Sequence, residues 1–243
     1  LYHPAAFPAA RLTFLAPLDA QQSPSIQKLL EQLAKQAGHH GAFHLQAEAE
    51  SDSAVFETLR RSGFSAYTRQ RIWRYNDRLA AEKASFMWRA ARPIDRVPVT
   101  SLYRQVVPDF VQNIESLDSQ PLSGMVYSDG NEFLAYAEIK YGARGIWVKP
   151  VIKPDIEQVD QLVKGLLHSI PERRSRPIFL CARAYQPHLE PALEALGAEP
   201  GARQIALVKH LAAHHKLREA FALPNLEGRS EASAPLAQTR RNS

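Results

Sequence analysis

The sequence contains little cysteine, since Cys181 is the single one among 243 residues. One thiol excludes an internal disulfide framework and is typical of a protein in a reducing compartment, so we predict a cytoplasmic location. Cys181 lies within the apolar run "IFLCA". An apolar setting favours a buried, inert thiol over a nucleophile.

Long apolar runs are missing as well. No stretch reaches the roughly eighteen apolar residues that a membrane-spanning helix needs, and no charged segment followed by an apolar one indicates a secretory signal. We therefore expect no membrane partner. The first residue is Leu1 instead of methionine, so we also expect the native chain to start upstream.

The excess of one charge is small. Lysine and arginine number 30 against 25 aspartate and glutamate residues, a formal net charge of +5. A basic chain can bind nucleic acid or other anions, but so mild an excess favours ordinary solubility, and we expect no nucleic-acid partner. What the chain does have is 45% hydrophobic residues, enough to bury a sizeable core.

One segment, "YTRQRIWRY", interleaves aromatic and basic residues. On a strand, one face would carry Tyr67, Arg69, Arg71, Trp73 and Tyr75. Arginine among aromatic residues can stack on nucleic-acid bases. Cross-strand packing on a half-exposed sheet uses the same residue types, and we favour packing.

Apolar periodicity and turn residues predict an α/β chain in two parts. The first part reads as strand, helix, strand, helix and strand, over 11–17, 23–38, 42–49, 51–63 and 64–75. The second part opens with a strand over 86–92 and a helical region over 99–117, which Pro108 should kink or split.

Three strands over 123–152 follow, with Asp129 and Gly130 at the first hairpin turn. The last elements are a helix, a strand, a helix and a strand, over 156–170, 176–185, 187–197 and 202–212.

The chain therefore divides into four regions. These are a partial domain, a linker, a complete domain and a C-terminal extension, over 1–76, 77–85, 86–212 and 213–243. The extension is rich in Ser, Ala and Pro and should be largely disordered after Leu223.

The two parts repeat one order of elements. "FLAP" (14–17) aligns with "WVKP" (147–150) at an offset of 147 − 14 = 133. An offset of 135 aligns Leu45 with Leu180, and an offset of 134 aligns the glycines that follow the second helices, Gly63 and Gly197. We expect these glycines to adopt the left-handed conformation that reverses the chain. The strand after each glycine should then pair beside the sheet that the helix covers.

This order resembles the GNAT acetyltransferase fold. A strand ending in V-x-P, a helix, a buried strand, a second helix and "SGF" or "LGA" before a last strand form the C-terminal half of that fold. "LRRSGF" (59–64) is similar to its helix-to-strand signature. The resemblance implies a GNAT-like mixed sheet flanked by helices, with one complete copy plus the C-terminal half of another, as in tandem GNAT proteins.

The resemblance also implies a cofactor. Active members bind acetyl-CoA along the strand that ends in V-x-P, and the next helix receives the diphosphate at its N-terminal N–H groups. By this resemblance the cofactor-binding residues of the complete copy are Trp147, Val148, Lys149, Lys153 and Gln158.

The glycines of the family motif, Q/R-x-x-G-x-G/A, are missing. Glycine lets the backbone approach a phosphate closely, but Pro24 and Ile26 stand there in the first copy, and Glu157 and Val159 in the second. No shift of the alignment restores them, because no glycine occurs over 18–37 or 149–164. The acetyl-CoA motif is thus degenerate in both copies.

The family's catalytic tyrosine is also replaced. Leu59 and Leu193 hold the position of the general acid in the second helices, and leucine cannot donate a proton. Tyr185, just before the second helix, could substitute, and Glu138 in "AYAEIKY" lies where such enzymes place a base. The plainer alternatives are a packed tyrosine and an outward-facing charge on an alternating strand.

No metal site is predicted. His210, His214 and His215 have a spacing that suits a helix, but no carboxylate or cysteine completes a ligand set. One hypothesis is an acyl-CoA-dependent N-acetyltransferase with an amine or small-molecule acceptor. The other is a catalytically degenerate GNAT-like module that binds a small ligand or a protein partner. The missing glycines and tyrosines favour the second, and the usual activity of the family favours the first.

Overall fold

The computed structural model describes five stretches of the chain, 9–15, 24–76, 86–117, 121–130 and 132–211. All of them fall in one unit, Leu1–Ala213. The predicted linker and C-terminal extension lie outside the described residues, as do His214 and His215. Within the described stretches, no helix combines the length and apolar character needed to cross a bilayer.

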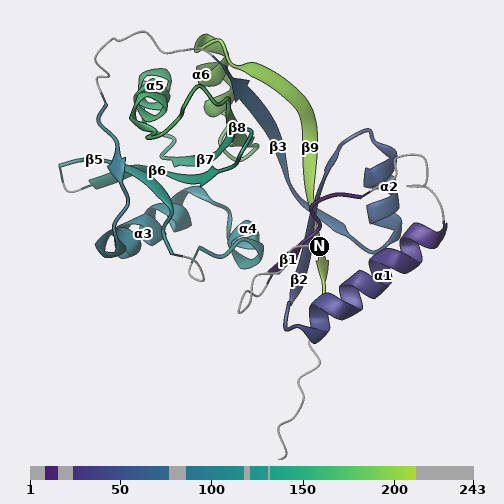
Figure 1. Cartoon of the computed structure of the whole chain (residues 1–243). Coiled ribbons are helices and arrows are strands. Elements are labelled where there is room, and N and C mark those ends of the chain that lie inside the picture. Colours follow the sequence, from purple (N-terminus) through teal and green to yellow (C-terminus); the bar gives the residue numbers. More distant parts are fainter. Residues whose placement is uncertain (1–8, 16–23, 77–85, 118–120, 131, 212–243) are drawn as a thin grey trace, which may run out of the picture. The chain divides into compact units, whose positions relative to one another are not determined.

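Among the described residues, nine strands form one mixed sheet in the order β1-β2-β9-β3-β8-β7-β6-β5-β4 (Figure 1). The pairs β1–β2 and β7–β8 are parallel, and the other neighbours are antiparallel. Along the chain the strands are β1 Ala9–Arg11, β2 His44–Glu50, β3 Ser65–Tyr75, β4 Arg89–Ala90, β5 Gly124–Asp129, β6 Glu132–Tyr141, β7 Ile146–Ile152, β8 Ile178–Arg183 and β9 Glu199–His210.

Helices flank this sheet, so the predicted mixed sheet flanked by helices is confirmed. They are α1 Pro24–His39, α2 Ala54–Arg61, α3 Arg96–Val106, α4 Asp109–Ile114, α5 Val159–Ser169 and α6 Leu189–Ala195, with a short 3-10 helix at Pro93–Asp95. The predicted break at Pro108 is confirmed, because α3 ends before Pro108 and α4 begins after it. The predicted turn at Asp129 and Gly130 is also confirmed, between β5 and β6.

Side-chain alternation assigns the two faces of β8 to different cores. Leu180 and Ala182 join the core beneath α5 and α6. Cys181 and Arg183, which alternate with them, face the side covered by α3 and α4 (Figure 1). The buried thiol donates to the side-chain amide oxygen of Gln70 at 3.3 Å, and burial raises the pKa of Cys181 to about 11. These facts agree with the inert thiol that the sequence predicts.

The two turns after α2 and α6 match closely. Gly63 and Gly197 have φ of 82° and 75°, so the predicted left-handed conformation is confirmed at both. The residue after each glycine then donates its N–H back to a leucine carbonyl, from Phe64 to Leu59 at 3.1 Å and from Ala198 to Leu193 at 3.0 Å. The same helix-ending turn is thus built twice.

The long strands that follow these turns are exchanged between the two parts of the chain. We call residues 9–76 the N-terminal segment and residues 86–211 the C-terminal segment. β9 of the C-terminal segment pairs with β2, and β3 of the N-terminal segment pairs with β8. The strand after each glycine thus does not join the strand before its helix, because β9 separates β2 from β3, and β3 separates β8 from β9.

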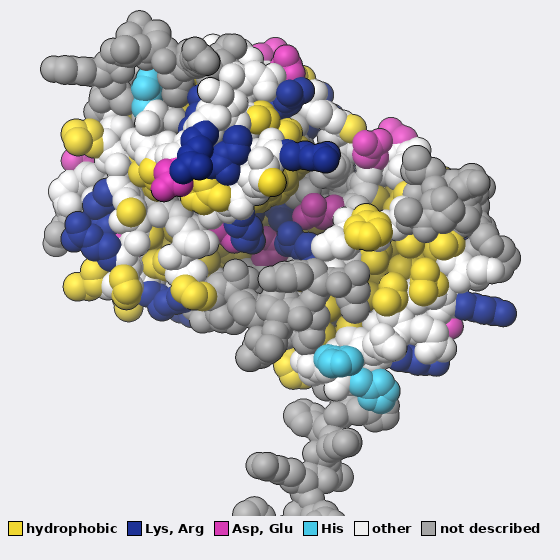
Figure 2. Space-filling view, in the orientation of Figure 1, with side chains coloured by type: hydrophobic (Ala, Val, Ile, Leu, Met, Phe, Trp, Pro, Cys, Tyr) yellow, Lys and Arg dark blue, Asp and Glu magenta, His cyan; other side chains and the backbone are white. Residues whose placement is uncertain are grey.

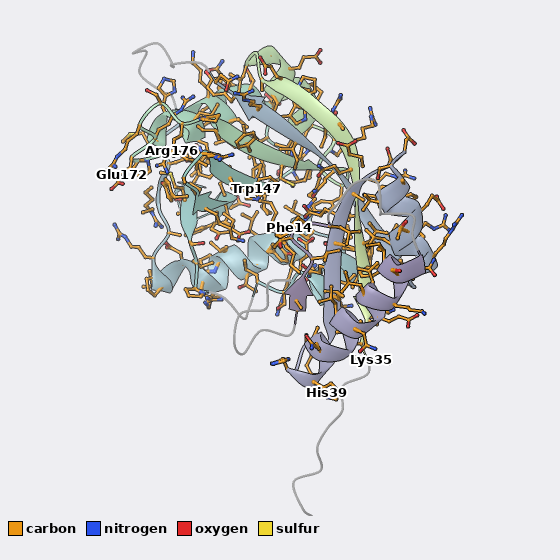
Figure 3. All side chains as sticks on the ribbon, turned by 45° about the vertical axis from the view of Figure 1, so that its right-hand side comes forward. Phe14, Lys35, His39, Trp147, Glu172 and Arg176 are labelled. Atoms are coloured by element: carbon orange, nitrogen blue, oxygen red, sulfur yellow. The ribbon has the colours of Figure 1, made fainter. Side chains whose placement is uncertain are left out.

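The strand predicted over 11–17 is displaced. Observed β1 ends at Arg11, and Phe14 beyond it is 78% exposed. Leu45 pairs with Ala10 whereas Leu180 pairs with Val148, so the strand offset is 148 − 10 = 138 instead of 133. Phe14 therefore lies outside β1 while Trp147 lies within β7 (Figure 3). The reason is a longer connection before α1 than before α5.

A bulge in β3 overturns the prediction of a shared aromatic face. The pairing with β9 shifts between Ala66 and Thr68, which leaves Tyr67 as an extra residue. A bulge re-aims side chains, so Tyr67 joins the core beside α3 and α4 whereas Trp73 and Tyr75 join the core under α5 and α6. Trp73 and Tyr75 are packed, which agrees with the packing that we favoured over base stacking.

His210 lies on β9 and not on a helix, so the helical spacing predicted for the histidines fails there. It is the cross-strand partner of His44, and their rings meet edge-on with centroids 4.9 Å apart. The residues that the structure describes hold no group of three or more metal-ligating side chains.

Candidate active site where β7 and β8 separate

The parallel strands β7 and β8 pair over a short length and then part. Their register runs from Ile146 to Val148 and stops there, although β7 continues to Ile152. The Ile146 N–H donates to Pro177 before β8, and the Lys153 N–H donates to Leu134 on β6. Backbone groups of even-numbered β7 residues therefore face β8. Past Val148, the groups of Pro150 and Ile152 lose their strand partner.

A side chain takes the place of that partner. Gln186, in the connection from β8 to α6, donates its amide N–H to the Pro150 carbonyl at 3.0 Å and accepts the Ile152 N–H at 2.8 Å. Gln186 is fully buried. His188 hydrogen-bonds the Ile152 backbone as well, although burial still lowers the pKa of its ring. The point of separation is thus closed by the β8–α6 connection.

A buried polar cluster lies on the α3 and α4 side of this junction. At its centre is Glu115, which directly follows α4 and is 6% exposed at its side chain. Its carboxylate accepts hydrogen bonds from Lys149 at 2.9 Å, Arg183 at 2.6 Å and Tyr67 at 2.5 Å. These three partners come from β7, β8 and β3, so one carboxylate ties together strands from both segments.

The charges of this Glu115 cluster stabilise one another. Burial disfavours the charged form of Glu115, but Lys149 and Arg183 outweigh burial and hold its pKa well below the usual range. Burial likewise opposes the charge on Lys149, and Glu115 and Glu138 together raise the pKa of its ammonium. Both groups are charged at neutral pH. In the space-filling view, basic and acidic side chains meet near the middle of this face (Figure 2).

Glu138, the predicted base, lies on β6 at the edge of the Glu115 cluster. It pairs with Lys140 at 2.7 Å and lies 3.8 Å from Lys149. Burial raises its pKa, but Lys149 and Lys140 outweigh burial, so the net pKa of Glu138 is lowered. Its side chain is 16% exposed, so it is not simply an outward-facing surface charge.

Tyr185, the predicted acid, follows β8 and packs partly against the core beside α3 and α4. Burial is the main cause that raises the pKa of Tyr185 to about 12, against the opposing effects of Lys149 and Arg183. The phenol is therefore protonated at neutral pH. The structure brings Tyr185 and Glu138 to the same charged cluster, from opposite sides of β7.

The five predicted cofactor-binding residues are spread over both faces and the end of β7. Trp147 and Val148 lie opposite Phe179 and Leu180 of β8, and Val148 is fully buried. Lys149 belongs to the Glu115 cluster instead of an open edge. Lys153 pairs with Glu132, and Gln158 immediately precedes α5 without capping it.

Sequence reasoning missed Glu115, Arg183 and Gln186. Glu115 falls within the helical region predicted over 99–117, and Gln186 stands in the connection "AYQPH", and neither position carries a local signal of a buried polar contact. Arg183 gave a signal, because a charged residue at the end of the apolar run "IFLCAR" needs a buried partner. It is 3% exposed, and its Nε and Nη1 atoms have no hydrogen-bond partner among the described residues.

The corresponding connection in the N-terminal segment, from β2 to α2, borders an open groove of about 680 Å³. The groove lies between α1 and α2 and is lined by Gln27, Ser51, Asp52, Ser53, Ala54, Glu57, Thr58 and Arg61. Ser53 caps α2 by accepting the Phe56 N–H at 3.2 Å, and Ser51 donates its N–H to Arg203 of β9.

No family model and no curated protein matches this chain. Solved structures do match. A tandem GNAT protein from the clavulanic acid biosynthesis pathway aligns with a TM-score of 0.51 at 15% identity, over 85% of this chain and 76% of that one. A GCN5-related N-acetyltransferase from Sphaerobacter thermophilus gives a TM-score of 0.51 at 12% identity, over 77% and 69%.

A conserved protein of unknown function from Staphylococcus epidermidis gives a TM-score of 0.53 at 11% identity, over 83% of this chain and 84% of that one. Identities this low show a shared fold. Together with the separating parallel strands, the alignments show that this chain has the fold of the GNAT acetyltransferases.

Proposed function

We propose that the protein is an acyl-CoA-dependent N-acetyltransferase whose reaction centre lies where β7 and β8 separate. The observation that carries this proposal is the parallel pairing that ends at Val148, within a chain of GNAT fold. Separation frees a strand edge beside a buried cluster that contains both an acid and a base. The acceptor would be an amine that approaches from the α3 and α4 side.

The strand edge suits the pantetheine arm of acetyl-CoA, since an amide already binds there. Gln186 uses the Pro150 carbonyl and the Ile152 N–H, and pantetheine carries amides with the same donor and acceptor groups. Trp147 and Val148 would adjoin the arm. When bound, the cofactor supplies the acetyl thioester, and the arm must replace the amide of Gln186.

The diphosphate of acetyl-CoA fits the residues near α5 less well than the pantetheine arm fits the strand edge. No glycine lies between β7 and α5, and Glu157 and Asp160 bring negative charge to the start of the helix. Two anions at about 4 Å repel by roughly 1 to 4 kcal/mol, depending on screening. Lys153 and Gln158 are the residues that would contact this end, Lys153 after leaving Glu132.

Tyr185 and Glu138 take the proton-transfer roles in this proposal. Tyr185 holds its proton at neutral pH and can donate it to a departing thiolate. Glu138 is ionised and can accept a proton from an ammonium group. Lys149 cannot serve as a base, because Glu115 and Glu138 keep it protonated. It would position Glu138 instead.

The test combines ligand binding with turnover. Acetyl-CoA at a hundred times its Kd should stabilise the protein by about 2.7 kcal/mol in a thermal-shift experiment. An assay of thiol release with a panel of amines should show that Tyr185→Phe lowers kcat by about a hundredfold and leaves the Kd for acetyl-CoA unchanged. Tyr141→Phe is the matched control, because Tyr141 is 49% exposed at the end of β6.

Two results would contradict the proposal. One is the absence of any thermal shift at millimolar acetyl-CoA together with no acetylated amine. The other is a Tyr185→Phe variant and a Glu138→Gln variant that both turn over at the wild-type rate.

A further inference from the structure

We infer that Gln186 is an intramolecular competitor for the acyl-CoA arm, whose side-chain amide occupies the strand edge until it is displaced. This inference rests on the proposed function and adds a gate to it. The gate consists of one side chain and the two backbone groups of β7 that it holds, the Pro150 carbonyl and the Ile152 N–H.

The first support is the chemistry of the edge. Pro150 has no N–H, so past Val148 the edge that faces β8 offers the Pro150 carbonyl and then the Ile152 N–H. Gln186 satisfies this acceptor and this donor with one amide, at 3.0 Å and 2.8 Å. A ligand amide that binds the edge needs the same two groups. Gln186 and the arm therefore cannot use the edge together.

The second support is the way the backbone of Gln186 is fixed. Its N–H donates to Arg183 at 2.9 Å and its carbonyl accepts from Leu189 at 3.2 Å, which makes a turn between β8 and α6. Just before it, Ala184 donates to Arg69 of β3 at 2.9 Å. The backbone is thus anchored on both sides. Opening the edge requires rotation of one side chain and leaves the turn in place.

The third support is the N-terminal segment, where the equivalent connection is open. Ser51, Asp52 and Ser53 line the groove of about 680 Å³ between α1 and α2, and the Ser51 hydroxyl donates to the Arg203 carbonyl of β9 at 3.5 Å. Closure in the C-terminal segment comes from the residue at position 186.

The expected effect follows from two hydrogen bonds. Each buried hydrogen bond contributes about 1 kcal/mol net, and displacement of Gln186 forfeits both. Since 1.4 kcal/mol is about a tenfold change in affinity, removal of the side chain should tighten acetyl-CoA binding by about tenfold to thirtyfold.

The experiment compares wild type, Gln186→Ala and the control Gln112→Ala. Gln112 also donates its amide to a backbone carbonyl, that of Val107 at 2.6 Å, but it lies on α4 away from the β7 edge. Calorimetric titration should show tighter acetyl-CoA binding for Gln186→Ala alone. If Gln186→Ala does not fold, Gln186→Ser is used in its place, because the shorter side chain leaves room for water to bridge the two backbone groups.

A second readout, amide hydrogen exchange at Ile152, does not depend on catalysis. Exchange should be slow in wild type, faster in Gln186→Ala, and slow again when acetyl-CoA is added to that variant. Gln112→Ala should exchange like wild type. Restored protection would identify the arm at the edge that Gln186 left.

The outcomes separate the inference from the proposed function. If wild type acetylates amines and Gln186→Ala binds acetyl-CoA no more tightly, the inference fails and the function stands. If Gln186→Ala binds acetyl-CoA and wild type does not, the inference about Gln186 stands. The proposal that the unmodified protein transfers acetyl groups then fails. An Ile152 amide that acetyl-CoA does not protect in Gln186→Ala overturns the inference, whatever the activity.

Discussion

The connections from β2 to α2 and from β8 to α6 occupy equivalent places in two runs of the same elements, yet one is open and the other closed. Both follow a strand that pairs in parallel with an earlier strand, β2 with β1 and β8 with β7. Both also lead into a helix that ends in the same glycine turn. The first borders a groove and the second is sealed by Gln186. The comparison teaches that the C-terminal segment fills the place where its parallel strands part with one side chain, that of Gln186, whereas the N-terminal connection borders a groove between helices.

The segments also differ in how charge is buried. The Glu115 cluster places a carboxylate, an ammonium and a guanidinium in the C-terminal segment with little solvent contact. The N-terminal segment contributes Tyr67 to this cluster through the exchanged strand β3. The charged cluster is therefore one place where the two segments are joined by polar contacts.

The largest expected effect comes from breaking that joint. Glu115→Ala leaves Lys149 and Arg183 without their buried counter-ion. This should lower the free energy of unfolding, measured by urea denaturation, by about 3 to 5 kcal/mol. Glu132→Ala is the control, because Glu132 pairs with Lys153 but is 62% exposed, and it should cost less than about 1 kcal/mol. Equal losses in the two variants would show that burial of the cluster has no energetic weight.

A smaller effect should appear as the pH falls. The pKa of Glu115 is depressed in the folded protein, so its contribution to stability is complete above the unfolded value of about 4.3 and is lost as the pH drops below it. Glu115→Gln cannot titrate, and its unfolding free energy should fall less steeply between about pH 5 and pH 2. Parallel curves for the two proteins would mean that other carboxylates account for the acid loss.

The smallest effect tests the equivalence of the two glycine turns. Alanine at Gly63 or Gly197 must adopt a positive φ, which should cost about 1 to 2 kcal/mol at either site. A Cβ at Gly63 would lie 3.6 Å from the Lys209 ammonium, an ordinary contact, so strain alone should set the loss there. Thermal unfolding measures both variants. If the stability lost by the two variants differs by a factor of three, the two turns are not equivalent.

Much of the fold could be predicted from local signals. Element order, the hairpin at Asp129 and Gly130, the break at Pro108 and the two glycine turns all depend on residues close in sequence. The pairing of the last strands could not, because β3 and β9 choose their neighbours through contacts more than a hundred residues apart. Periodicity describes a strand's faces and says nothing about which edge it joins.

Only part of the candidate site can be predicted from the sequence, for the same reason. The resemblance to the GNAT fold singles out Glu138 and Tyr185. Glu115 and Arg183 lie 68 residues apart, and only their 2.6 Å contact identifies them as partners. Tyr67 was assigned to the wrong face, because a bulge adds a residue that strand alternation does not anticipate. Gln186 has no local signature, since its partners lie on a strand more than thirty residues earlier.

The exchange of β3 and β9 also determines when β2 can pair during synthesis of the chain. β2 emerges early from the ribosome, but its antiparallel neighbour is the last strand that the structure describes, and their register joins His44 to His210. Until that strand is made, β2 has a bare edge on one side and the three-residue β1 on the other. Loop closure over such a distance is slow, so the nascent chain exposes this edge of β2 until β9 is made.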